Sequence, residues 1–265
     1  MLRNVFLKTL RDQRRALTWW GIGMAVYLAV YVPFYTQYTD AGSGFAKQVD
    51  RLPETLRRAF NLSDMTSPAG YLESTVFGVV GPLLVIMFAG TLGARAIAGE
   101  EEAGTLDLLL VHPISRRRFV LERFGALTAA VLGLGVLFWA VTAALAAGID
   151  MNIGIDRLAA GTAGLALLAL GFGTLALTAG AFSGHRGPVL GITASAAVLA
   201  YVVNAFAPQV DALEPVQKLS PFYYFQGGDP LRAGFQFGDL GVLLAIALAL
   251  LAVALWAFDR RDVAV

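Results

Sequence analysis

The sequence predicts an all-α membrane protein with six transmembrane helices. Hydrophobic residues make up 57% of the 265-residue chain and charged residues only 15%, against about 25% in soluble domains. The mean hydropathy is +0.65, and the charges gather in short segments between six long apolar runs. Each run is long enough to cross a bilayer as a helix, so residues 1–265 are expected to form a single transmembrane domain. The six expected spans lie at about residues 16–38, 75–94, 124–148, 158–182, 188–207 and 240–258.

Residues 1–15 are predicted to form an amphipathic helix that lies in the membrane interface. Leu2, Val5 and Leu10 share one helical face, and basic residues occupy most of the rest. The alternative is an ordinary basic flank of the first span. A cleaved signal peptide is not expected, because the apolar run that follows exceeds the roughly 7–15 residues of a signal core.

Two segments on the opposite side of the membrane carry helix-breaking residues. Gly78, Gly81 and Pro82 predict a kink in the outer half of the second span. Residues 208–239 contain four prolines and the aromatic run 222–225, which is too long for a turn and too broken for a span. We expect short external helices there that dip into the outer leaflet; the alternative is an external loop with an aromatic belt.

The distribution of basic residues predicts the orientation. Six spans place both termini on one side of the membrane, and 13 of the 20 Lys and Arg residues fall in the segments of that side. Cytoplasmic loops carry the excess of Lys and Arg. The chain is therefore expected to cross the plasma membrane several times, with both termini in the cytoplasm.

The most charged stretch, residues 99–118, lies between the second and third spans. Its leucines at i, i+3 and i+4 share one helical face, and acidic residues precede them. A leucine-faced helix of this kind suits a groove on another protein. The alternative is a loop that only connects the two spans. Its leucines would then be exposed to water with no contact to explain them. The defining residues are, in order, Glu100, Glu101, Glu102, Gly104, Thr105, Leu106, Leu109, Leu110, Pro113 and Ser115.

The sequence also excludes several classes of protein. No span carries Asp, Glu, Lys or Arg between its flanks, which argues against an ion-coupled transporter or a proton pump. Lys8, Lys47 and Lys218 do not follow a phosphate-binding glycine pattern, so the chain itself is not expected to hydrolyse ATP. With no cysteine and only His112 and His185, we expect neither a metal site nor a catalytic site.

The order of residue types between Ile97 and Phe124 resembles the permease subunits of type-2 ABC exporters. It runs Glu-Glu-x-Gly-Thr-Leu-x-Leu-Leu-Leu and then Pro-Ile-Ser-Arg-Arg-Arg-Phe. The six spans and the broken segment before the last one agree with this resemblance. It implies a pair of permease copies and two copies of a separate subunit that binds ATP and Mg, with no cofactor on this chain. Membrane lipid is the other expected partner, and nucleic acid is not.

The resemblance further implies a coupling helix and a substrate path. The contact with the ATP-binding subunit would be formed by Glu100, Glu101, Glu102, Gly104, Thr105, Leu106, Leu109 and Pro113. The path would run between the subunits, with Met87, Phe88, Ala197, Tyr201 and Asn204 as candidate lining residues.

An apolar path suits a lipophilic drug, antibiotic or lipid, carried outward by alternating access. The alternatives are a permease-like subunit with a sensing or maturation role and, less favoured, a membrane-embedded enzyme.

Overall fold

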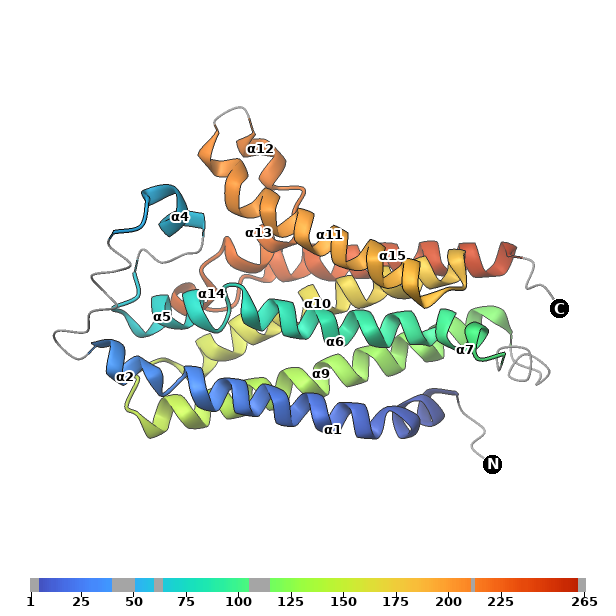
Figure 1. The fold of residues 1–265 in the computed structure, drawn as a ribbon, viewed down its shortest axis with the longest axis horizontal. Helices are drawn as coiled ribbons and strands as arrows, with labels where there is room; N and C mark the ends of the chain where they lie inside the picture. The colour runs from blue at the N-terminus through green and yellow to red at the C-terminus, as the bar shows by residue number, and fades with distance from the viewer. Residues whose placement is uncertain (1–4, 40–50, 60–63, 105–114, 211–212, 262–265) are drawn as a thin grey trace.

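The computed structural model is an elongated bundle of helices (Figure 1). It describes residues 5–39, 51–59, 64–104, 115–210 and 213–261. The long helices are α1 (Val5–Tyr31), α6 (Val80–Ala96), α9 (Arg116–Gly148), α10 (Ile155–Ser183), α11 (Arg186–Phe206) and α15 (Phe237–Arg260). The short ones are α2 (Phe34–Thr39), α4 (Glu54–Ala59), α5 (Pro68–Thr75), α7 (Ala98–Glu102), η1 (Ala207–Gln209), α12 (Glu214–Gln217), α13 (Pro221–Gln226) and α14 (Pro230–Ala233).

The long helices form a multi-pass membrane protein. Within the described ranges, five candidates are long and apolar enough to cross a bilayer, and α5 and α6 make a sixth if they count as one bent span. These two helices meet at 45°. The break falls at residues 76–79 and contains Gly78, while Gly81 and Pro82 lie in the first turn of α6. The kink predicted from these residues is therefore confirmed.

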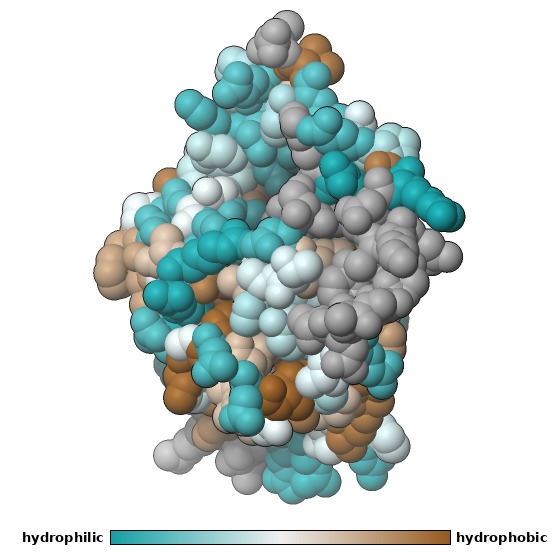
Figure 2. Space-filling view, turned by 90° about the vertical axis from the view of Figure 1, so that its left-hand side faces the viewer, coloured by the Kyte–Doolittle hydropathy of each residue, from teal (hydrophilic) through white to brown (hydrophobic). Residues whose placement is uncertain are grey.

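Both described ends of the chain lie at one end of the bundle, next to α7 (Figure 1). We call this the terminal end. The opposite end, which carries α2, α5 and α14, is called the far end. Seen from the far end, hydrophilic residues gather on the upper and central part of the coloured surface, and hydrophobic residues lie at its side and in its lower part (Figure 2). This distribution is the one expected where a membrane protein emerges from the bilayer.

The N-terminal segment differs from the prediction of a separate interface helix. Helix α1 runs without a break from Val5 to Tyr31, because its first glycine is Gly21 and it contains no proline. Its start is packed onto α9: Oε2 of Glu122 accepts hydrogen bonds from the backbone nitrogens of Val5 (2.7 Å) and Phe6 (3.3 Å). These bonds satisfy donors that a helix start otherwise leaves unpaired. The described residues before position 16 are therefore the first turns of the first span.

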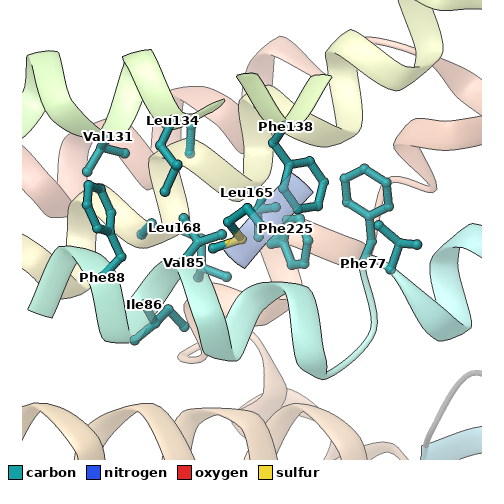
Figure 3. Packing of buried hydrophobic residues seen from close by; sticks show 14 of the residues in the cluster. Phe77, Val85, Ile86, Phe88, Val131, Leu134, Phe138, Leu165, Leu168 and Phe225 are labelled. Carbon is teal, nitrogen blue, oxygen red and sulfur yellow. The ribbon is translucent and has the colours of Figure 1, made fainter. Parts of the chain in front are cut away.

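Helix α10 lies at the centre of the bundle. It packs against α6, α9, α11 and α15, and most of its apolar stretch is buried. In the core, Phe88 of α6 lies beside Val131 of α9, and Leu168 of α10 lies close to Val85 (Figure 3). Small residues let the helix axes approach closely, as is common in membrane bundles.

The segment between α11 and α15 contains short helices, and two of the four rings in its aromatic run are buried. Phe222 and Phe225 of α13 are each 3% exposed, and Leu231 of α14 is 1% exposed. Phe225 points into the core between α6 and α10 (Figure 3). Short helices are therefore present as expected, and the segment is not a plain loop. That these helices dip into the outer leaflet stays a prediction.

Replacing Gly93 with alanine should destabilise the bundle. A Cβ atom there would overlap the carbonyl oxygen of Gly173, so α6 and α10 would have to separate. Overpacking of this kind costs about 1–3 kcal/mol. We expect Gly93→Ala to lower the thermal unfolding midpoint of the detergent-purified protein by several degrees. The matched control is Gly133→Ala, where nothing lies within 4 Å of the added atom; an equal loss in both variants would contradict the close approach.

Candidate functional site

Helix α7 continues the chain one residue beyond α6 at the terminal end. Its backbone is anchored in the bundle, since Ile97 and Ala98 are fully buried. The helix ends before Gly104, which has φ +64°. Thr105, Leu106, Leu109 and Pro113, the other residues predicted for the coupling contact, lie outside the described residues. What α7 presents is three consecutive carboxylates, and each of them binds an arginine from a different part of the chain.

The first carboxylate reaches α9. Oε1 of Glu100 lies 2.6 Å from Nη2 of Arg123, a side chain that is only 4% exposed. Nη1 of Arg123 donates to the Thr9 hydroxyl of α1 at 2.9 Å, and the guanidinium lies 5.1 Å from the ring centroid of Phe119. Breaking a buried pair by removing one partner is strongly destabilising. This pair therefore fixes α7 to both α9 and α1.

The second carboxylate reaches the residue that follows α15. Glu101 accepts two hydrogen bonds from Arg261, at 2.9 and 2.7 Å, in a bidentate arrangement. Such arrangements add geometric specificity to the charge attraction. Gly184 makes room for the pair, because a Cβ atom there would lie 2.5 Å from Oε2 of Glu101.

The third carboxylate holds the beginning of α11. Oε2 of Glu102 accepts from Nε of Arg186 at 2.6 Å, and Oε1 accepts from the backbone nitrogen of Arg186 at 2.7 Å. These hydrogen bonds to Arg186 hold the pKa of the Glu102 carboxyl below its usual value. A carboxylate at a helix N-terminus is also favoured by the helix dipole. Glu102 thus links the end of α7 to the start of the fifth span.

The start of α9 is joined to the end of α15 by further contacts. The hydroxyl of Ser115 caps α9 by accepting from the backbone nitrogen of Arg118 at 3.3 Å, as expected for a helix start at that residue. Arg117 pairs with Asp259 at 2.7 Å, and Arg116 donates to the carbonyl oxygens of Phe258 and Arg261. Ion pairs and hydrogen bonds therefore connect both flanks of residues 105–114, α7 and the start of α9, to the end of α15.

A groove of about 420 Å³ runs between α6 and α11. Its lining is almost entirely apolar, and three of the predicted path residues, Met87, Ala197 and Tyr201, belong to it. The hydroxyls of Thr91 and Thr193 also face this region, but each donates to a carbonyl of its own helix, at 2.8 Å. The groove therefore offers apolar surface with little free hydrogen-bonding capacity.

The other two predicted path residues do not line this groove. Phe88 is fully buried on another face of α6 and lies edge-on to Trp20, with centroids 5.8 Å apart. Asn204 lies beyond the groove at the far end, where its Nδ2 donates to Oε1 of Gln226 at 3.0 Å.

A second charged cluster joins α5 to α14 at the far end. Arg232 lies 2.6 Å from Asp64, 2.8 Å from Asp229 and 3.5 Å from Glu73. The Ser67 hydroxyl, helped by Arg232, lowers the pKa of the Asp64 carboxyl. Within the parts of the chain that the structure describes, no group of three His, Cys, Asp or Glu side chains could hold a metal ion.

Sequence reasoning missed the arginines that bind α7. Arg123, Arg186 and Arg261 belong to the 13 basic residues on which the predicted orientation rests, and the glutamates were predicted to contact another subunit. In the structure the same carboxylates are paired within the chain. The available signal was the presence of arginines at several span ends on the same side of the membrane as the three consecutive glutamates. Contact of the 99–118 segment with a partner stays a prediction.

Comparison with known proteins agrees with this architecture. A family model described as "ABC-2 family transporter protein" matches residues 3–263, which is nearly the whole chain. A search of the curated proteins finds no match. Permeases of this family are non-catalytic transmembrane subunits, and membership implies association with an ATP-binding subunit. The chain, with its helical bundle and apolar groove, therefore belongs to the ABC-2 transporter family as a transmembrane permease.

Proposed function

We propose that the chain is the permease of an ATP-driven exporter that moves a lipophilic molecule out of the cytoplasm. Two copies pair, and each docks one ATP-binding subunit through residues 99–118. ATP and Mg bind to those partners and not to this chain. The observation that carries the proposal is α7: a helix at the start of the predicted docking segment whose side chains bind the ends of three spans.

The terminal end is assigned to the cytoplasm of a cell with this chain in its plasma membrane. Arginines with exposed side chains crowd this end, among them Arg11, Arg14 and Arg15 on α1 and Arg117 and Arg118 on α9. Basic residues at span ends favour the cytoplasmic side, where anionic lipid head groups attract them. The basic first turns of α1 would thus lie at the inner membrane interface.

The ion pairs give α7 a means of coupling. A partner that displaces α7 also pulls on Arg123, Arg186 and Arg261, because charge-assisted hydrogen bonds of 2.6–2.9 Å resist separation. The ends of α9, α11 and α15 therefore move with it. Alternating access needs such a connection between ATP hydrolysis in one subunit and helix movement in another.

The groove supports a lipophilic cargo. A charged or strongly polar molecule would lose its hydration there without finding partners, which is costly. An acyl chain or a neutral aromatic compound has little polar hydration to lose, and burial of its apolar surface in the groove is favourable. The outer surface of α11 is suited to the second permease copy, since only 17% of its apolar stretch is buried within the monomer.

Docking of the ATP-binding subunit can be tested by changing the leucines on the predicted apolar face of residues 99–118. We expect Leu106→Asp with Leu109→Asp to abolish co-purification of the ATP-binding subunit, because charges would replace the apolar face of the segment. Leu108→Asp is the matched control, since Leu108 lies off that face in a helical segment. Full co-purification of the double variant would overturn the docking assignment.

Coupling can be tested at the Glu101–Arg261 pair. We expect Arg261→Glu to remove permease-dependent stimulation of ATP hydrolysis, because two carboxylates would then face each other. The exchange Glu101→Arg with Arg261→Glu should restore much of it. The control is Arg260→Glu, because Arg260 lies over the Trp256 ring and not on α7. If Arg261→Glu leaves the stimulation of ATP hydrolysis unchanged, the Glu101–Arg261 pair does not take part in coupling.

The groove can be tested by filling it. Ala197→Trp should abolish ATP-driven transport of a neutral lipophilic fluorophore in proteoliposomes, because the indole would occupy the space of the cargo. Partner binding and ATP hydrolysis should persist. Leu248→Trp, at an exposed position on α15, should transport normally. Transport by the filled variant would place the path elsewhere, and absence of transport by the unmodified complex would favour a sensing or maturation role.

A further inference from the structure

Three side-chain amides lie together where the groove ends at the far end of the molecule. Nδ2 of Asn204, near the end of α11, donates to Oε1 of Gln226 at 3.0 Å. Nε2 of Gln226 donates in turn to the backbone carbonyl of Gly78 at 3.3 Å. Gln217 of α12 donates to both the side-chain and backbone oxygens of Asn204, each at 3.2 Å. One glutamine of α13 thus bridges the two helices that form the groove walls.

The helix that carries Gln226 also covers the end of the groove. Phe222 of α13 belongs to the groove lining and is 3% exposed. Its ring meets Tyr201 in a T-shaped arrangement at 5.5 Å. The Ser220 hydroxyl donates to the carbonyl of Ala200 at 2.7 Å and accepts from the backbone nitrogen of Phe222 at 3.2 Å. Helix α13 is therefore attached to α11 at its start, and its last residue, Gln226, contacts the break before α6.

The Gly78 carbonyl can accept this bond because it lies at the break before α6 and the residue four positions later is Pro82. Within a helix a carbonyl is occupied by the N–H four residues later, and proline has no N–H to donate. The Gly78 carbonyl oxygen is therefore available as an acceptor at the far end of the α6 wall, and Nε2 of Gln226 donates to it. Asn204 provides the partner on the other wall and is itself only 9% exposed. Neither contact involves a net charge, so the bridge can open at modest cost.

We propose that Asn204 and Gln226 form a clasp that holds α13 over the groove and closes its outer end between transport cycles. Separation of α6 and α11 at this end requires Gln226 to release either Gly78 or Asn204, which uncovers the groove. The clasp rests on the proposed function in one respect: the far end must face the outside of the cell.

The absence of cysteine from the chain allows a direct test. A single reporter, Ala197→Cys, places a thiol in the groove lining. Intact cells that express the full complex are treated with a membrane-impermeant maleimide, and the rate of labelling is measured. We expect Gln226→Leu to raise that rate about tenfold, since the hydrogen bond that opening must break is then absent and one neutral hydrogen bond shifts an equilibrium by up to about this factor.

Two controls separate opening of the clasp from general loosening. Gln209→Leu removes a glutamine at the same end that donates to the carbonyls of Ala205 (3.1 Å) and Thr55 (3.3 Å). It should leave the labelling rate unchanged. A second reporter, Ala143→Cys, lies partly buried on α9. Its rate should not change when Gln226→Leu is added. Asn204→Leu should reproduce the effect of Gln226→Leu at Ala197→Cys.

Each contrary result has a distinct meaning. An unchanged rate in Gln226→Leu, or an equal rise in Gln209→Leu or at Ala143→Cys, would overturn the clasp. Orientation is checked with Glu54→Cys on α4, whose side chain is exposed at the far end. If this thiol reacts only in inverted membrane vesicles, the proposed orientation is wrong. The labelling rates at Ala197→Cys with and without Gln226→Leu are then compared in those vesicles to test the clasp. The labelling needs no cargo, so it does not depend on whether transport is observed.

Discussion

The consecutive carboxylates of α7 organise the terminal end of the molecule. Because they follow one another on a short helix, they point in different directions and bind arginines of α9, α11 and the end of α15. A helix of five residues has little stability of its own. Its position is set by these pairs and by the buried Ile97 and Ala98 at its base. Ion pairs therefore connect α7 to the ends of three spans.

The groove walls are held at both ends, but by different chemistry. At the terminal end, α6 leads into α7, and Glu102 binds both the side chain and the backbone of Arg186 at the start of α11. At the far end, neutral amides connect Asn204 with the break before α6. Hydrogen bonds to charged groups are roughly twice as strong as neutral ones. The two ends of the groove are therefore held by an ion pair at the terminal end and by neutral amides at the far end.

The elements that sequence predicts best are those that depend on local pattern. The spans, the kink near Gly78 and the helix start at Ser115 follow from hydropathy, glycine and proline positions and capping chemistry. The pairing of α7 did not follow, because three arginines far apart in sequence were equally suited to the lipid interface. Phe88 was misplaced for a different reason. Helix α6 is apolar on all sides, so periodicity cannot show which face meets the core and which meets the groove.

Burial indicates which helices can move. Helix α10 packs against four long helices, and a shift in it would disturb contacts on every side. A close-packed core resists such gradual deformation. Helix α11 has most of its apolar stretch outside the monomer core, and its far end is bound by Ser220, Gln217 and Gln226 of the segment between α11 and α15. We therefore expect a change in the groove to come from movement of α11 rather than of the central α10, because a shift of α11 breaks fewer core contacts.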